Sequence, residues 1–160
     1  MGRSHRPKAI APPALRQEPK TIGGGTRGGT SKQTPTFCFA RADHSPPAGC
    51  KFGFDFAANA GHEVLMFLHE MSKLSWAEIE MQQTGSAAKR HRKHHGHPLA
   101  RLGDEAQARI AALHLVDTFG DDELFRFRLS GERRLWGFRS ERTFHVLWWD
   151  PDHQVYPTEK

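Results

Sequence analysis

Arginine side chains recur in the last third of the chain at spacings that suit a β-sheet. Arg126 and Arg128 stand two positions apart in the segment ELFRFRLS, so a strand would present both side chains on one face. Arg139 follows on the next predicted strand, RRLWGFR. Because a guanidinium group matches phosphate oxygens through paired hydrogen bonds, this spacing predicts a sheet face that binds phosphate.

Groups that could move a proton or stack on a base follow close behind. His145 alternates with apolar residues in TFHVLWW, which predicts that it lies on the polar face of a strand. Imidazole changes charge near neutral pH and serves as either acid or base. His153 and Tyr156 come at the end of the predicted sheet, and the ring of Trp149 is suited to stacking on a base.

Each of these residues also has a structural interpretation. Arg126 and Arg128 are compatible with ordinary solvent-facing positions of an antiparallel strand, and His145 with a packed, hydrogen-bonded histidine. The stretch 150–152, Asp-Pro-Asp, is more typical of a turn than of paired catalytic carboxylates. The aromatic and aliphatic residues expected in the core are Trp136, Phe144, Val146 and Trp148.

The apolar pattern predicts one α+β domain over residues 34–160, preceded by a disordered basic tail over 1–33. The expected elements are a β-hairpin at 34–57, helices at 59–84, a basic His-rich loop at 86–98, a helix at 104–116 and an antiparallel sheet of three or four strands at 123–157. Ser75 and Glu78 form a capping-box pattern that begins the second helix. Helices followed by strands indicate a layer of helices on one side of the sheet.

Size and charge exclude several classes of protein. The chain has 160 residues and a formal charge of +5, but residues 1–33 hold seven Lys/Arg against one acid, so the rest sums to −1. The tail is therefore expected to be a solubilising segment or a nucleic-acid contact. The sequence has no stretch of about 18 apolar residues, no recognisable secretory leader and only two cysteines, so we expect a cytoplasmic protein without membrane contact.

The segment SAAKRHRKHHGHP mixes cations and histidines without apolar periodicity. Its cations are Lys89, Arg90, Arg92 and Lys93, which can contact an RNA backbone or simply keep a loop solvated. Its histidines are His91, His94, His95 and His97, and a second, thinner set of potential ligands is Cys38, His44, Cys50 and His62. Neither spacing matches a zinc motif, so we expect no metal and no cofactor.

The segment FRFRLSGERRLWGFRSERTFHVLWWDPDHQVY resembles the C-terminal strands of the RelE/ParE toxin superfamily. In that family a strand of the type F-R-L-R-x-G precedes a turn, a second basic strand and a closing element with His and Tyr. Arg133 and Arg134 fall where the second strand has its basic residue, and His153 with Tyr156 resembles the closing element. The likeness spans residues 60–157, although the Arg that follows the closing His in the family is absent here.

The resemblance implies a RelE-like fold and a toxin-type endoribonuclease that cuts mRNA, with the ribosome as a suspected site of action and an antitoxin protein as a partner. Cleavage by the RNA's own 2′-hydroxyl needs a base, an acid and cations, but no metal. Catalysis would then fall to His145, His153, Tyr156 and Arg128. RNA contacts would fall to Arg126, Arg133, Arg134, Arg139 and Trp149. The basic segment 89–97 has no counterpart in the family, and its cations Lys89, Arg90, Arg92 and Lys93 would add RNA contacts through their charge.

Two other functions fit the same residues. A non-catalytic member of this fold would bind nucleic acid or a protein partner, as ParE-like relatives do when they target gyrase. A structural or interaction module without enzymatic activity is the remaining alternative.

Overall fold

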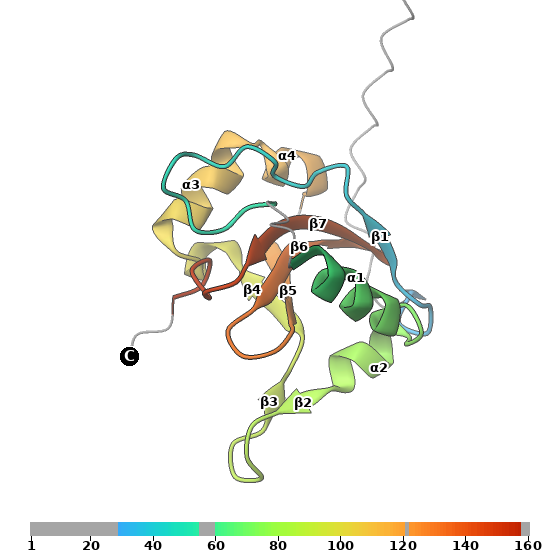
Figure 1. The fold of residues 1–160 in the computed structure, drawn as a ribbon. Coiled ribbons are helices and arrows are strands. Elements are labelled where there is room, and N and C mark those ends of the chain that lie inside the picture. Colours follow the sequence, from blue (N-terminus) through green and yellow to red (C-terminus); the bar gives the residue numbers. More distant parts are fainter. Residues whose placement is uncertain (1–28, 55–59, 121, 158–160) are drawn as a thin grey trace, which may run out of the picture.

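The computed structural model describes residues 29–54, 60–120 and 122–157, which form a five-stranded sheet between two pairs of helices (Figure 1). The strand order is β1-β7-β6-β5-β4; β1 is parallel to β7 and the other pairs are antiparallel. These strands are β1 (Thr36–Cys38), β4 (His95–Pro98), β5 (Glu123–Arg128), β6 (Arg134–Ser140) and β7 (Thr143–Asp150). The predicted α+β class is confirmed. Among the described residues, no helix is both long and apolar enough to span a membrane.

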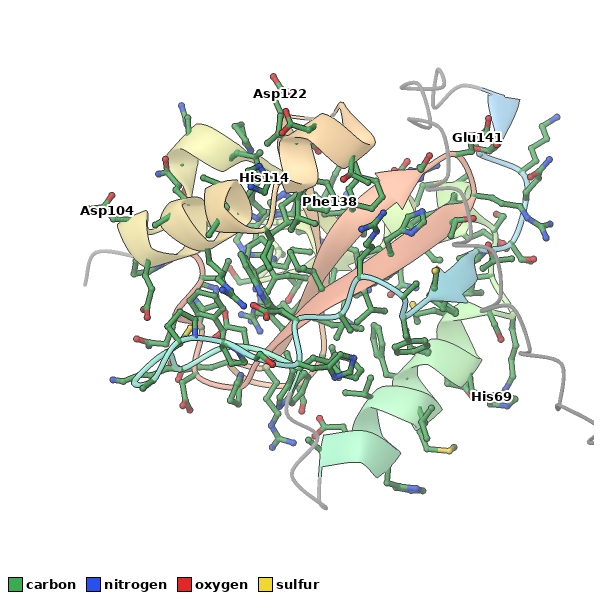
Figure 2. The ribbon with its side chains drawn as sticks, turned by 90° about the horizontal axis from the view of Figure 1, so that it is seen from above. His69, Asp104, His114, Asp122, Phe138 and Glu141 are labelled. Atoms are coloured by element: carbon green, nitrogen blue, oxygen red, sulfur yellow. The ribbon has the colours of Figure 1, made fainter. Side chains whose placement is uncertain are left out.

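The helices cover both faces of the sheet, so the expectation of helices on one side only is wrong. Helices α1 (Ala60–Met71) and α2 (Trp76–Met81) pack on one face, while α3 (Asp104–Ala112) and α4 (Leu115–Phe119) pack on the other. Figure 2 shows Phe138 of β6 in the layer beneath α4, where its ring stacks on Phe119 at 4.7 Å. The physical reason is that β6 and β7 carry large apolar side chains on both faces, and each face must be buried.

Local signals in the helical region are largely confirmed. Ser75 caps α2, and the reciprocal hydrogen bonds of the capping box with Glu78 are both present. The predicted helix at 104–116 is instead two helices, because the chain turns at His114, whose φ is 51°. Gly103 occupies the N-cap position of α3.

The N-terminal segment is organised differently from the prediction. The expected hairpin at 34–57 is wrong, because β1 pairs with β7 and residues 52–54 contribute only an isolated bridge between Gly53 and Trp149. The strand predicted near the start of this segment is present as β1, but long-range packing selects β7 as its partner. Residues 55–59, within and beside that hairpin, lie outside the described residues.

Part of the predicted tail belongs to the folded domain. The carbonyl oxygens of Ser31 and Gln33 accept hydrogen bonds from the backbone N–H groups of Ala77 and Trp76, at 2.8 and 3.0 Å. Since the first N–H groups of a helix have no partner within the helix, these contacts complete the start of α2. The remainder of the predicted tail, residues 1–28, lies outside the described residues.

A β-bulge in β7 changes which side chains face which core. Trp136 pairs with Trp148 and Gly137 pairs with Val146, so Leu147 is an extra residue opposite β6. Beyond the bulge the faces switch: Trp148 joins the core beneath α3 and α4, and Trp149 joins the core beneath α1 and α2. Strict alternation had predicted the opposite faces for these two tryptophans.

Replacing Gly137 with alanine should destabilise the protein, because this glycine allows the bulge to close. A Cβ atom at this position would lie 2.1 Å from the carbonyl oxygen of His145 and 2.7 Å from the ring of Phe144. Gly137→Ala is expected to lower the free energy of unfolding by about 1–3 kcal/mol, measured by urea denaturation. Gly29→Ala, with no atom within 4 Å of the new methyl group, is the control. An unchanged midpoint for Gly137→Ala would contradict this register.

Candidate functional site

A cavity of about 660 Å³ opens where β5 ends and β6 begins. We call it the arginine cavity. It is lined by His91, Arg126, Arg128, Gly131, Glu132, Arg134, Asp152, His153, Gln154 and Pro157. These residues come from β3 (His91–Arg92), β5, the β5–β6 turn, β6 and the turn after β7. Segments far apart in the sequence therefore converge on one hollow.

Strand register brings three arginines to the cavity. Arg128 and Arg134 are paired directly across β5 and β6, and Arg126 lies two residues back on the same face as Arg128. Arg126 is 9% exposed and Arg134 is 5% exposed, and Arg128 is half-buried. Within the part of the chain that the structure describes, none of the three forms an ion pair with a carboxylate. Cations are rarely buried without such a partner.

Carboxylates act on these arginines only from beyond ion-pair distance, as Asp150 and Glu132 do on Arg134. Burial lowers the pKa of Arg126 to about 10, with the neighbouring charges of Arg134 and Arg128 acting in the same direction. Burial also lowers the pKa of Arg134. Both groups remain charged at neutral pH, and the Nε atom of each is buried without a hydrogen-bond partner. The cavity consequently offers buried N–H donors and three guanidinium groups to an anion, beside the carboxylates of Glu132 and Asp152 that also line it.

His95 orients Arg126 without neutralising it. The Nδ1 of His95 lies 3.0 Å from the carbonyl oxygen of Gly96, which can only accept, so Nδ1 carries the proton. The other ring nitrogen, Nε2, must then accept from Nη2 of Arg126 at 3.0 Å. Burial lowers the pKa of His95, which favours this neutral form. A carboxylate in the same place would cancel the positive charge.

Stacked aromatic side chains pack beside Arg126 and His95. His97 packs on His95 with ring centroids 4.3 Å apart, on Tyr156 at 4.6 Å and on Trp136 at 5.3 Å. The guanidinium of Arg126 lies over the ring of Trp136, 6.0 Å from its centroid. Tyr156 therefore packs against His97 and is not among the residues that line the cavity. The predicted sheet at 123–157 ends earlier than expected, since residues 153–156 form no strand.

His153 is held at the cavity by a buried carboxylate. Asp150, which is fully buried, accepts hydrogen bonds from the backbone N–H of Gln154 at 2.7 Å and of Val155 at 3.1 Å. It also accepts one from the indole N–H of Trp136 at 3.1 Å. These contacts fix the turn in which His153 adopts a φ of 58°, a left-handed conformation that is costly for most residues. Backbone strain of this kind is often found at functional sites.

The imidazole of His153 is held in its neutral form, which can accept a proton but has none to donate from the ring nitrogen that carries the lone pair. Burial lowers its pKa, and the positive charge of Arg134 lowers it further, while Asp150 acts in the opposite direction. At neutral pH the ring is therefore predominantly neutral, with a free lone pair. Of the predicted site residues, the structure brings Arg126, Arg128, Arg134 and His153 together.

Other predicted site residues lie elsewhere. His145 pairs with Phe138, four positions along β6 from Arg134, about 13 Å away at the usual rise of a strand. There it packs on Phe119 with ring centroids 4.8 Å apart. Arg139 projects to the opposite face, where it pairs with Glu80 and lies 4.0 Å from the ring centroid of Trp76.

Two more candidates are engaged in structural contacts. Arg133 pairs with Glu63 of α1, on the opposite face of the sheet from the cavity's arginines. Trp149 is 6% exposed within the core beneath α1 and α2, so its ring has no open face for a base. The bulge in β7 is the reason, since it turns Trp149 inward.

The segment 86–98 is not simply a loop. Residues 91–92 form β3, which pairs with β2 (Gln83–Thr84) in a hairpin that projects from the body, and 95–98 form the edge strand β4 (Figure 1). Lys89, Arg90 and Arg92 are exposed on the hairpin. Lys93 lines a separate shallow pocket beside Glu63 and Phe67.

His94 joins that hairpin to the sheet. It is fully buried, its Nδ1 accepts from the backbone N–H of Arg128 at 3.1 Å, and its Nε2 donates to Oε1 of Gln82 at 3.2 Å. Burial lowers its pKa to about 3. Sequence inspection missed the structural roles of His94, His95 and His97, although the alternation of His95 and His97 is itself a period-two signal.

Searches against protein-family models, curated proteins and solved structures gave no match to this chain.

Proposed function

We propose that this protein is a metal-independent endoribonuclease of the RelE-like toxin type, with the arginine cavity as its active site. The observation that carries the proposal is the set Arg126, Arg128 and Arg134, which surround one cavity with His153 and have no carboxylate partner among the described residues. An anion of tetrahedral geometry with several acceptor oxygens satisfies these donors. The neutral imidazole of His153 adds a base beside it.

The reaction uses the RNA's own 2′-hydroxyl. His153 accepts the proton of that hydroxyl as its oxygen attacks the adjacent phosphorus, and the bond to the 5′-oxygen breaks. Arginine side chains bind the non-bridging oxygens and stabilise the extra negative charge of the phosphorane. The products are a 2′,3′-cyclic phosphate and a 5′-hydroxyl end. DNA, which lacks the 2′-hydroxyl, is not cleaved by this route.

The β2–β3 hairpin extends the binding surface. Its exposed cations Lys89, Arg90 and Arg92 neighbour His91, which itself lines the cavity. Contacts of this kind bind the phosphate backbone without reading its sequence. In this proposal the protein acts in the cytoplasm on free or ribosome-bound mRNA, and an antitoxin protein restrains it.

A transcript-end map after brief induction tests the proposed activity. New 5′-hydroxyl ends at discrete mRNA positions, together with growth arrest, are the expected result. Unchanged transcript ends and normal growth while the protein accumulates would overturn it. Binding of RNA by the purified chain without cleavage would instead support the non-catalytic alternative, because the same arginines can bind phosphate without chemistry.

Removing one cavity arginine should weaken RNA binding in a salt-dependent way. Arg128 is half-buried and forms no ion pair with an acid among the described residues, so Arg128→Gln should fold normally. The affinity for a short single-stranded RNA is expected to fall about tenfold, and the slope of log K against log salt to decrease by about 0.7. Arg41→Gln, an exposed arginine of another pocket, should change neither. Equal effects of both variants would contradict a specific site.

A further inference from the structure

We propose that His91 is a second catalytic residue, the general acid that protonates the leaving 5′-oxygen. This inference rests on the proposed ribonuclease activity and adds a residue that neither the sequence pattern nor the resemblance assigns. The observation behind the inference is where the His91 side chain lies. His91 and His153 line the same cavity from different elements, β3 and the turn after β7. The arginines Arg126, Arg128 and Arg134 line it as well, together with the acids Glu132 and Asp152.

The β2–β3 hairpin holds His91 in a defined place. His91 pairs with Thr84 in the strand register, and the backbone N–H of Lys93 donates to the carbonyl oxygen of Gln82 at 2.8 Å. The side chain of Gln82 is in turn bonded to the buried His94, which anchors the base of the hairpin to β4 and β5. The position of His91 is therefore linked to that of the cavity's arginines.

A tight turn keeps the His91 ring close to the hairpin backbone. Gly85 has a φ of 105°, and a Cβ there would lie 2.2 Å from the carbonyl oxygen of Lys89 and 3.4 Å from Cε1 of His91. Glycine is thus required beside the imidazole by both its conformation and the lack of space.

The two histidines differ in a way that suits opposite roles. His153 is partly buried and its pKa is lowered by burial and by Arg134, so its resting form is the neutral imidazole that a general base requires. His91 is exposed, so solvent can return a proton to it after each turnover. Of the cavity groups that the proposed function uses, His153 serves as the base, and an arginine holds its proton too strongly at neutral pH to supply it to the 5′-oxygen.

The proposed step conserves bonds, protons and charge. The 2′-oxygen forms a bond to phosphorus and transfers its proton to His153, while the bond between phosphorus and the 5′-oxygen breaks and that oxygen takes a proton from His91. The charges of the two imidazoles are exchanged, and proton transfer with water restores them. No oxidant, reductant or metal takes part in this step.

A substrate with sulfur in place of the leaving 5′-oxygen tests this role, since a thiolate leaves without being protonated. We expect His91→Gln to slow cleavage of the ordinary RNA by about 10²-fold or more, and to cleave the sulfur-containing RNA within a few-fold of the parent. His153→Asn should slow cleavage of both substrates. His69→Gln, an exposed histidine on α1 that Figure 2 shows pointing away from the sheet, should affect neither.

The outcomes separate this inference from the proposed function. If the parent protein cleaves neither RNA, the ribonuclease proposal itself is wrong. If the parent cleaves both, but His91→Gln is equally impaired on both or on neither, His91 is not the acid. A urea midpoint matching the parent should accompany His91→Gln, because the side chain is exposed, and any loss of rate then reflects chemistry rather than folding.

Discussion

Replacing His153 with asparagine is expected to reduce RNA cleavage by about 10²–10⁴-fold while leaving RNA binding nearly unchanged. Asparagine is chosen because it tolerates the left-handed backbone that His153 adopts, with φ at 58°, so the turn after β7 is retained. The arginines that bind phosphate are untouched. Only the imidazole that accepts the proton of the 2′-hydroxyl is removed.

Single-turnover cleavage and equilibrium binding of a non-cleavable 2′-deoxy analogue measure the two effects separately. His145→Gln is the matched control, since His145 packs on Phe119 away from the cavity, and it should cleave at the parent rate. The parent rate should fall as the pH decreases through the lowered pKa of His153, because protonation removes the base. Normal cleavage by His153→Asn would remove His153 from the mechanism.

Acidification is expected to destabilise the fold through two buried histidines. The pKa values of His94 and His97 are lowered by burial from 6.5 to about 3. Between about pH 3 and pH 6.5 these two histidines bind protons in the unfolded chain but not in the folded protein. Their contribution to the free energy of unfolding is therefore fully present above pH 6.5 and is lost as the pH falls. At pH 5 the loss is about 2 kcal/mol for each histidine, a large part of the stability of a small domain. Asp150, whose pKa is raised by burial, acts in the opposite direction.

The variant His97→Phe isolates one of these contributions. Phenylalanine keeps a ring to pack on Tyr156 and Trp136 and removes an Nε2 that is buried without a partner. Between pH 7 and pH 5 the variant should lose about 2 kcal/mol less free energy of unfolding than the parent does. Urea denaturation at both pH values measures this difference. The exposed His69→Gln serves as the reference. A pH dependence identical to that of the parent would show that His97 is accessible to protons in the folded state.

Much of the site was visible in the sequence because strand geometry is local. Residues two apart on a strand share a face, so the common face of Arg126 and Arg128 could be predicted without knowledge of the fold. The capping box at Ser75 and Glu78 is local for the same reason, since all its hydrogen bonds lie within one helical turn. The α+β class followed from the order of apolar periodicities along the chain.

The tertiary structure alone decided which of these groups meet. An extra residue at Leu147 reversed the faces of Trp148 and Trp149, and no local pattern signals such a bulge. Pairing between β4 and β5 placed His95 against Arg126, and the hairpin beside β4 brought His91 to the cavity. By itself the sequence determined the elements and the faces of uninterrupted strands. Register, bulges and strand partners depend on contacts between distant segments, whose free energies no local pattern contains.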